Sequence, residues 1–140
     1  MIEKVFIDSN VFIYAYTGDD NQKHSVARDL LRSNVLSNEI IVSAQVLSEF
    51  YSVMTRYQYP HREIKLCLNE IIEQVKVMPI ELETIKLCIL IKEKYKYSWW
   101  DSLVLASALE NDCSILYSED LQCNQVIENK LKIFNPFYSF

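Results

Sequence analysis

The sequence predicts an α/β protein in which helices cover both faces of a central, mostly parallel sheet. Apolar segments of strand length alternate along the chain with longer segments of helical periodicity. The strand segments are continuous apolar runs, which is typical of strands buried on both faces. The chain has 140 residues, half of them hydrophobic, and a single glycine, so one domain over residues 1–140 without a flexible linker is expected.

The first third of the chain is interpreted as a strand, a short helical segment and a helix. The run VFI at residues 5–7 combines β-branched and aromatic residues without a breaker, which predicts a buried strand beginning at Lys4. Val11–Tyr16 stays apolar and is expected to form a short helical turn, which a cluster of turn residues at 17–21 ends. His24–Ser33 places apolar residues three and four positions apart on one face, which predicts a helix.

Proline and capping residues divide the rest of the chain. Pro60, Pro79 and Pro136 each end an element, and Ser98 opens a helix. The remaining predicted helices are Ala44–Tyr57, His61–Gln74, Glu81–Tyr95 and Trp100–Asn111, and the remaining strands are Glu39–Ser43, Val75–Ile80, Ser114–Tyr117 and Lys132–Asn135. The crossovers between parallel strands are expected to be right-handed.

Composition and charge narrow the classes of function. The formal net charge is −5, the wrong sign for a protein that binds nucleic acid with its whole surface, although a local basic patch is allowed. Cys67, Cys88, Cys113 and Cys123 lack metal-ligand spacing and indicate a reduced, cytoplasmic protein. The first residues already form a strand and no apolar run reaches membrane-spanning length, so neither a signal peptide nor a membrane span is expected.

Four acidic residues stand out by their positions. Asp8 and Asp120 directly follow predicted strands, and in open parallel sheets ligands bind at the strand ends. Glu49 and Asp101 share their helix faces with apolar residues that point toward the core. Each also has an ordinary explanation: Glu49 at the edge of an apolar stripe, Asp101 as a helix cap together with Ser98, and Asp120 as a solvated turn acid.

Convergence of these acids predicts a metal site. Two unit charges about 4 Å apart repel by roughly 4 kcal/mol at an intermediate effective dielectric, so four facing carboxylates need a cation. Oxygen-only ligands suit Mg²⁺ or Mn²⁺. The two histidines, His24 and His61, lie outside these motifs, which argues against zinc. Glu119, next to Asp120, is expected to be a solvated turn acid.

Four segments in this order resemble the PIN-domain nucleases, and most of all the single-domain VapC-type toxins of toxin–antitoxin pairs. The segments are VFIDSN at residues 5–10, SEF at 48–50, WDSLVLASAL at 100–109 and LYSEDL at 116–121. The likeness continues through VIE at 126–128 and IFNP at 133–136, so it runs nearly end to end. Four motifs in the right order are much more specific than any one of them.

The resemblance implies a PIN-like three-layer α/β/α sandwich with a central, mostly parallel five-stranded sheet, forming one nuclease domain over residues 1–140. It also implies metal-dependent cleavage of RNA phosphodiester bonds with Mg²⁺ or Mn²⁺ as cofactor. A homodimer and a cognate antitoxin that masks the acidic pocket are typical of the family. Which RNA is cut, and whether one metal ion or two take part, stays open.

The site residues follow from the same resemblance, position by position. The catalytic and metal-binding acids would be Asp8, Glu49, Asp101 and Asp120, with Asp8 and Asp101 as the direct metal ligands, and the supporting residues would be Asn10, which steadies the first acid, and Ser118, beside the last one. Two departures from the family pattern keep the chemistry intact: Ser9 stands where Thr is frequent and retains the hydroxyl. Asn124 stands where many relatives have Gly, and Asn tolerates a left-handed backbone.

The RNA backbone would need a basic rim beside the acids. The candidates are Lys23, Arg28, Arg32, Arg56, Arg62 and Lys65, with Tyr57 and Tyr59 able to stack on bases. For each of them the ordinary solvated face of a helix is the competing interpretation. Trp99 and Trp100, together with the aromatic tail at 137–140, are expected to serve packing or a dimer interface.

Two other classes of function compete with the nuclease. A non-catalytic interaction module could keep the PIN scaffold, although four intact acids argue against it. An Asp-based phosphoryl-transfer enzyme would also place an Asp nucleophile at a strand end. Its Asp-x-Asp motif is broken here, because Asn10 occupies the second position.

Overall fold

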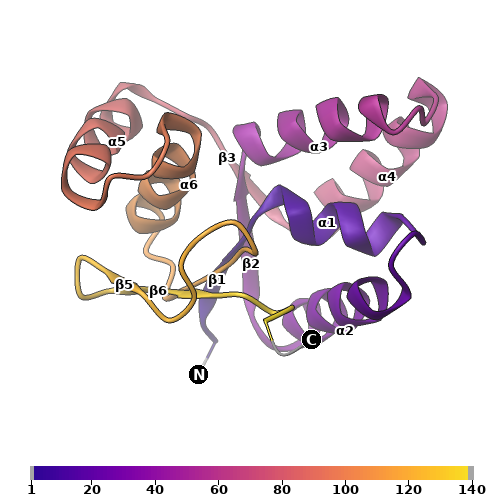
Figure 1. The fold of residues 1–140 in the computed structure, drawn as a ribbon, viewed down its shortest axis with the longest axis horizontal. Coiled ribbons are helices and arrows are strands. Elements are labelled where there is room, and N and C mark those ends of the chain that lie inside the picture. Colours follow the sequence, from indigo (N-terminus) through magenta and orange to yellow (C-terminus); the bar gives the residue numbers. More distant parts are fainter. Residues whose placement is uncertain (1, 139–140) are drawn as a thin grey trace.

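The computed structural model describes residues 2–138, in which six helices and six strands alternate (Figure 1). The strands are β1 Lys4–Ile7, β2 Glu39–Ser43, β3 Lys76–Met78, β4 Ile115–Tyr117, β5 Val126–Ile127 and β6 Leu131–Phe134. The helices are α1 Ser9–Tyr16, α2 Asn21–Ser37, α3 Ala44–Arg56, α4 His61–Gln74, α5 Leu82–Tyr95 and α6 Trp99–Glu110. Within the described range no helix is both long and apolar enough to cross a bilayer. Phe140 of the predicted aromatic tail lies outside the described residues.

One sheet joins all six strands in the order β3-β2-β1-β4-β6-β5. Every pairing is parallel except that of β5 with β6. The predicted count of five strands was therefore wrong by one, because β5 was missed. β5 contains only Val126 and Ile127, of which the first is half exposed, so it offers no apolar run of recognisable length.

Helices cover both faces of this sheet, which confirms the predicted α/β/α sandwich. Figure 1 shows α5 and α6 on one side of β2 and β3, and α1, α2, α3 and α4 on the other side. Both α6 and α2 pack against β2, while α1 packs against α2 and α3, and α3 against α4. The helices α3 and α6, which carry Glu49 and Asp101, meet where Gln45 Nε2 donates a hydrogen bond to the Trp100 carbonyl oxygen.

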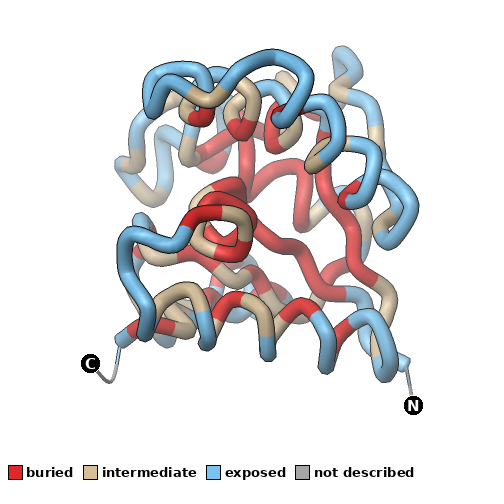
Figure 2. Tube along the Cα trace, turned by 90° about the vertical axis from the view of Figure 1, so that its right-hand side faces the viewer, coloured by how far each residue is buried: buried red, intermediate tan, exposed pale blue. Residues whose placement is uncertain are grey.

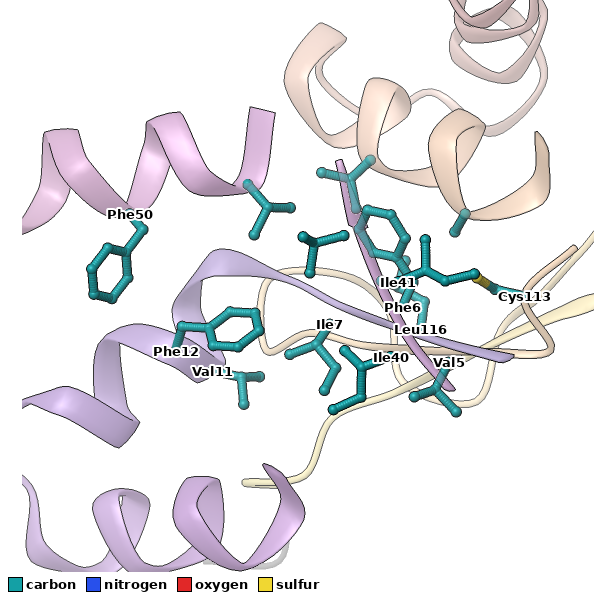
Figure 3. Packing of buried hydrophobic residues seen from close by; sticks show 14 of the residues in the cluster. Val5, Phe6, Ile7, Val11, Phe12, Ile40, Ile41, Phe50, Cys113 and Leu116 are labelled. Atoms are coloured by element: carbon teal, nitrogen blue, oxygen red, sulfur yellow. The ribbon is translucent and has the colours of Figure 1, made fainter. Parts of the chain in front are cut away.

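The core is centred on β1. Val5, Phe6 and Ile7 have no exposed surface, and Phe6 lies in register with Ile41 of β2 and Leu116 of β4. Figure 3 shows these side chains packed between the strands and the flanking helices. Buried residues follow the strands and the inward turns of the helices, while the outer turns are exposed (Figure 2). Because β1 is fixed on both edges and both faces, the residue that follows it is held rigidly.

Two helices are longer than predicted. α1 begins at Ser9, immediately after Asp8, and is a helix of eight residues rather than a short turn. α2 spans Asn21–Ser37, because the Asp20 side chain accepts a hydrogen bond from the Lys23 backbone N–H at 3.1 Å and so caps the helix earlier. The added turns carry few buried side chains, so they have no apolar periodicity to predict them.

Candidate active site

The chain changes direction across the sheet between β1 and β4. β2 and β3 lie on one side of β1, whereas β4 and β6 lie on the other. In open α/β sheets, ligands bind outside the carboxyl ends of the strands at such a switch point. Asp8 follows β1 and Ser118 follows β4, and the Asp8 N–H donates to the carbonyl oxygen of Tyr117 at 3.0 Å. The two strand ends that carry predicted site residues are therefore direct neighbours.

Asp8 is a buried carboxylate, 3% exposed, that is held by three donors. Its Oδ1 accepts from the Ser9 backbone N–H at 2.8 Å. Its Oδ2 accepts from the Ser118 hydroxyl at 2.8 Å and from Asn10 Nδ2 at 3.4 Å. Burial raises the pKa of Asp8 to about 7, against the opposing effect of the hydrogen bonds from Ser118 and Ser9. The negative charges of nearby carboxylates raise the pKa further.

Asn10 connects the first acid to the last one. Besides Asp8, its Nδ2 lies 3.1 Å from Asp120 Oδ2 and 3.3 Å from the Ser118 hydroxyl oxygen. Its Oδ1 accepts from the Glu119 backbone N–H at 3.3 Å. The Ser118 hydroxyl oxygen also accepts from the Asp120 N–H at 3.1 Å. The structure thus places Asn10 and Ser118 between Asp8 and Asp120.

Glu49 reaches the same place from α3. Its Oε2 accepts from the Ser9 hydroxyl at 3.1 Å, and its Oε1 accepts from Gln45 Nε2 at 2.6 Å. Gln45 Nε2 also donates to the carbonyl oxygen of Trp100 at 3.2 Å, which connects α3 to the first turn of α6. Gln45 is buried, and the sequence analysis did not single it out. Its spacing four residues before Glu49, on the same helix face, is the signal that could have found it.

Asp101 lies in the first turn of α6, as predicted. The Ser98 hydroxyl accepts from the Asp101 backbone N–H at 3.1 Å, so the predicted helix cap is present as well. Partial burial raises the pKa of the Asp101 carboxyl, and the charges of Asp120 and Glu49 raise it further, while a hydrogen bond with Ser98 opposes them. The cap and the acidic cluster are therefore compatible explanations of one residue.

The four carboxylates fit a hard divalent cation by their chemistry. All their donor atoms are oxygens, which Mg²⁺ and Mn²⁺ prefer, and a bound cation would offset the burial and the carboxylate charges that raise the pKa of Asp8. Within residues 2–138, no three acidic, histidine or cysteine side chains are grouped closely enough to hold a metal ion as they stand. The side chains of Glu49, Asp101 and Asp120 would have to move toward Asp8 to complete such a shell.

A cleft of about 840 Å³ opens beside the acids. Glu49 and Asp120 line it, and apolar side chains such as Ile13, Val53 and Leu103 form much of its wall. Arg56 also lines the cleft, seven residues after Glu49 on α3. At 1.5 Å of rise per residue, this spacing is two helical turns, or about 10 Å. The cleft therefore has an acid, Glu49, and a cation, Arg56, at separate points along α3.

The basic and aromatic residues predicted for the RNA rim have different surroundings in the structure. Of those predicted for the RNA rim, Arg56 and Tyr57 line the cleft. Lys23 instead forms an ion pair with Glu119 at 2.9 Å, and Arg28 lies 3.9 Å from Glu70. Glu119 was expected to be solvated, which was wrong: its side chain is 22% exposed and is bound to Lys23.

The chain belongs to the PIN domain family, whose sequence pattern it matches over residues 5–128. A search of curated proteins finds no match. Similar solved structures include the sarcin–ricin-loop-cleaving toxin VapC20 of Mycobacterium tuberculosis, with a TM-score of 0.67, 16% identity, and coverage of 80% of this chain and 86% of that one. A chain of VapBC2 from Rickettsia felis, bound to a promoter DNA fragment, has a TM-score of 0.67 at 14% identity and covers 94% and 99%. A chain of a toxin–antitoxin complex from Klebsiella pneumoniae has a TM-score of 0.70 at 15% identity, and the match covers 95% of this chain and 98% of that one. At these identities, the similarity shows a shared fold.

Proposed function

We propose that this protein is a metal-dependent endoribonuclease and the toxin component of a type II toxin–antitoxin pair. The observation that carries the proposal is Asp8, a carboxylate buried at the switch point of the sheet. Hydrogen bonds connect it to Glu49 through the backbone N–H and the hydroxyl of Ser9, and to Asp120 through the Asn10 side chain. A buried acid with a raised pKa among other acids is a functional-site feature, because it costs stability unless a cation binds.

Asp8 and Asp101 would hold Mg²⁺ or Mn²⁺, with Glu49 and Asp120 completing the site. A divalent ion bound there would lower the pKa of a water molecule and offset charge on the attacked phosphate. Ser118 and Asn10 keep Asp8 in one orientation through the hydrogen bonds described above. Glu49, whose two oxygens accept hydrogen bonds from Ser9 and Gln45, would orient the attacking water.

The cleft supports RNA as the substrate. Arg56 would bind a backbone phosphate about 10 Å from Glu49 along α3, and the exposed Tyr57 ring offers a stacking surface for a base. The apolar lining of the cleft, which includes the exposed Trp100, would exclude water from part of the path. A localised cation in the cleft reconciles RNA binding with a net charge of −5.

A protein partner is also part of the proposal. Two of the similar structures are toxin–antitoxin complexes, which supports a cognate antitoxin that covers the cleft, and a homodimer is proposed with it. All four cysteines are free thiols, which is consistent with a cytoplasmic location.

The test is cleavage of a fluorescently labelled single-stranded RNA by the purified protein. We expect cutting with Mg²⁺ or Mn²⁺ and none in EDTA, with single-stranded DNA of the same sequence left intact. The Asp8→Asn variant, purified identically, controls for contaminating ribonuclease. Cleavage that persists in EDTA, or a protein that binds no divalent ion and cuts no RNA, would contradict the proposal and favour the non-catalytic interaction module.

A further inference from the structure

We propose that Lys23, together with Tyr14 and Glu119, forms a clamp that positions the Asp120 side of the active site. In this role Lys23 is a positioning residue and makes no contact with RNA. The inference rests on the proposed nuclease function, and it assigns a task to a sheltered ion pair beside the site.

The clamp uses both oxygens of Glu119. Lys23 Nζ donates to Glu119 Oε2 at 2.9 Å and to the Tyr14 hydroxyl at 3.1 Å. The Tyr14 hydroxyl in turn donates to Glu119 Oε1 at 2.7 Å. The pKa of Lys23 is raised by Glu119 and then by Tyr14, so the ammonium stays charged and bound at physiological pH. Three side chains from α1, α2 and the segment after β4 thus form a closed ring.

Aromatic rings shelter this ion pair. Lys23 Nζ lies 4.7 Å from the centroid of the Tyr14 ring and 5.6 Å from that of Phe137, and these two rings meet edge to face at 5.0 Å. The side chains of Lys23 and Glu119 are 28% and 22% exposed. For comparison, Lys86 and Glu83 form a surface pair whose side chains are 62% and 74% exposed. Screening by solvent is weaker for the sheltered pair, so it can hold a fixed geometry.

Because Glu119 lies next to Ser118 and Asp120 in the sequence, its ion pair with Lys23 can affect the positions of both residues. Glu119 lies between Ser118, which binds Asp8, and Asp120, which is bound by Asn10. Three consecutive side chains therefore anchor the start of the connection from β4 to β5 at three separate points. Releasing the middle anchor allows Asp120 and Ser118 to move relative to Asp8, whose place is fixed by β1.

The test separates positioning from RNA contact by comparing three variants. Lys23→Met removes the positive charge of the clamp and keeps an unbranched side chain at this position. Lys86→Met removes the exposed pair on α5 as a matched control. Arg56→Met removes the proposed phosphate contact in the cleft. For each we would measure Mn²⁺ affinity without RNA, RNA affinity in EDTA over a salt series, and the cleavage rate at saturating RNA.

For Lys23→Met we expect Mn²⁺ affinity and cleavage rate to fall about 10-fold, the size typical for residues that orient metal ligands, with RNA affinity unchanged. Arg56→Met should show the reverse: unchanged Mn²⁺ affinity, weaker RNA binding, and a salt slope reduced by about 0.7, the value for one phosphate contact on a single strand. Lys86→Met should match the parent protein in all three measurements. Exchanging the charges, with Lys23→Glu and Glu119→Lys together, should restore part of the Mn²⁺ affinity that Lys23→Met loses.

A reduced salt slope for Lys23→Met with unchanged Mn²⁺ affinity would overturn the clamp and make Lys23 an RNA contact. If the parent protein binds no Mn²⁺, the nuclease proposal fails, and hydrogen exchange of the backbone amides at residues 118–122 decides the clamp by itself. Faster exchange in Lys23→Met that Lys23→Arg reverses supports the clamp, and unchanged exchange refutes it.

Discussion

Replacing Asp8 by Asn should stabilise the metal-free protein at neutral pH, although it removes the central acid of the site. The folded state raises the pKa of Asp8 from 3.8 to about 7, chiefly through burial. Between these pH values the unfolded chain loses the Asp8 proton while the folded protein keeps it, so stability falls as the pH rises through this window. Above about pH 7 the ionised Asp8 lowers the free energy of unfolding by its full amount, at most about 4 kcal/mol.

The net gain is smaller, because the amide cannot accept every hydrogen bond that the carboxylate accepts. An Asn side chain would keep the bond from the Ser9 N–H and lose one charged acceptor toward Ser118 or Asn10, at about 1 to 2 kcal/mol. That loss applies at every pH. The more informative quantity is therefore how the difference in unfolding free energy changes with pH. The unfolding free energy of Asp8→Asn minus that of the parent should rise by about 3 kcal/mol from about pH 5 to pH 8.

Urea denaturation in EDTA at these two pH values measures this quantity. Asp29→Asn, at an α2 side chain that is 77% exposed, is the matched control for loss of one negative charge. Saturating Mg²⁺ should stabilise the parent protein and leave Asp8→Asn unaffected, because the ion needs the carboxylate. An unfolding free energy for Asp8→Asn that lies below the parent by the same amount at both pH values would refute the reasoning about burial.

Two further predictions concern the helix that carries Glu49 and the centre of the sheet. Gln45→Leu should lower the cleavage rate by about 10- to 100-fold, because Glu49 loses its hydrogen bond from Gln45. The circular dichroism spectrum should stay unchanged. An unchanged cleavage rate would mean that Ser9 alone positions Glu49. Leu116→Ala should lower the free energy of unfolding by about 2 to 5 kcal/mol in a denaturant titration, since Leu116 is fully buried on β4. A decrease in unfolding free energy of less than about 1 kcal/mol would show that the core around β1 relaxes to fill the cavity left by the Leu116 side chain.

The sequence predicted the layers of the fold because the strands that matter most are apolar runs. Residues 5–7 and 40–43 are buried, so their apolar composition carries the signal. β5 escaped prediction because its short antiparallel pairing depends on where β6 lies, which composition does not encode. The predicted left-handed tolerance at Asn124 was confirmed, with φ of 72° in the connection before β5.

The candidate site was predictable to the extent that it is built from strand ends and helix faces. Asp8, Glu49, Asp101 and Asp120 could be proposed as site residues because each shares a helix face with apolar residues or follows a strand. The contact of Gln45 with Glu49 follows from helical spacing, but its contact with Trp100 and that of Lys23 with Glu119 join residues far apart in sequence, which local spacing does not reveal. Lys23 shows this most clearly, since an exposed lysine and a clamped one have the same sequence context.

The most direct test of the central claim, that these acids form one metal-dependent catalytic site, is the single-turnover rate of RNA cleavage by the Asp101→Asn variant in saturating Mn²⁺. Asp101 is the acid that arrives from α6, and its helix cap uses the Ser98 hydroxyl with the Asp101 backbone, so the substitution should leave the fold intact. The account predicts a rate lower than that of the parent protein by at least about 100-fold. Cleavage by Asp101→Asn at the parental rate would contradict it.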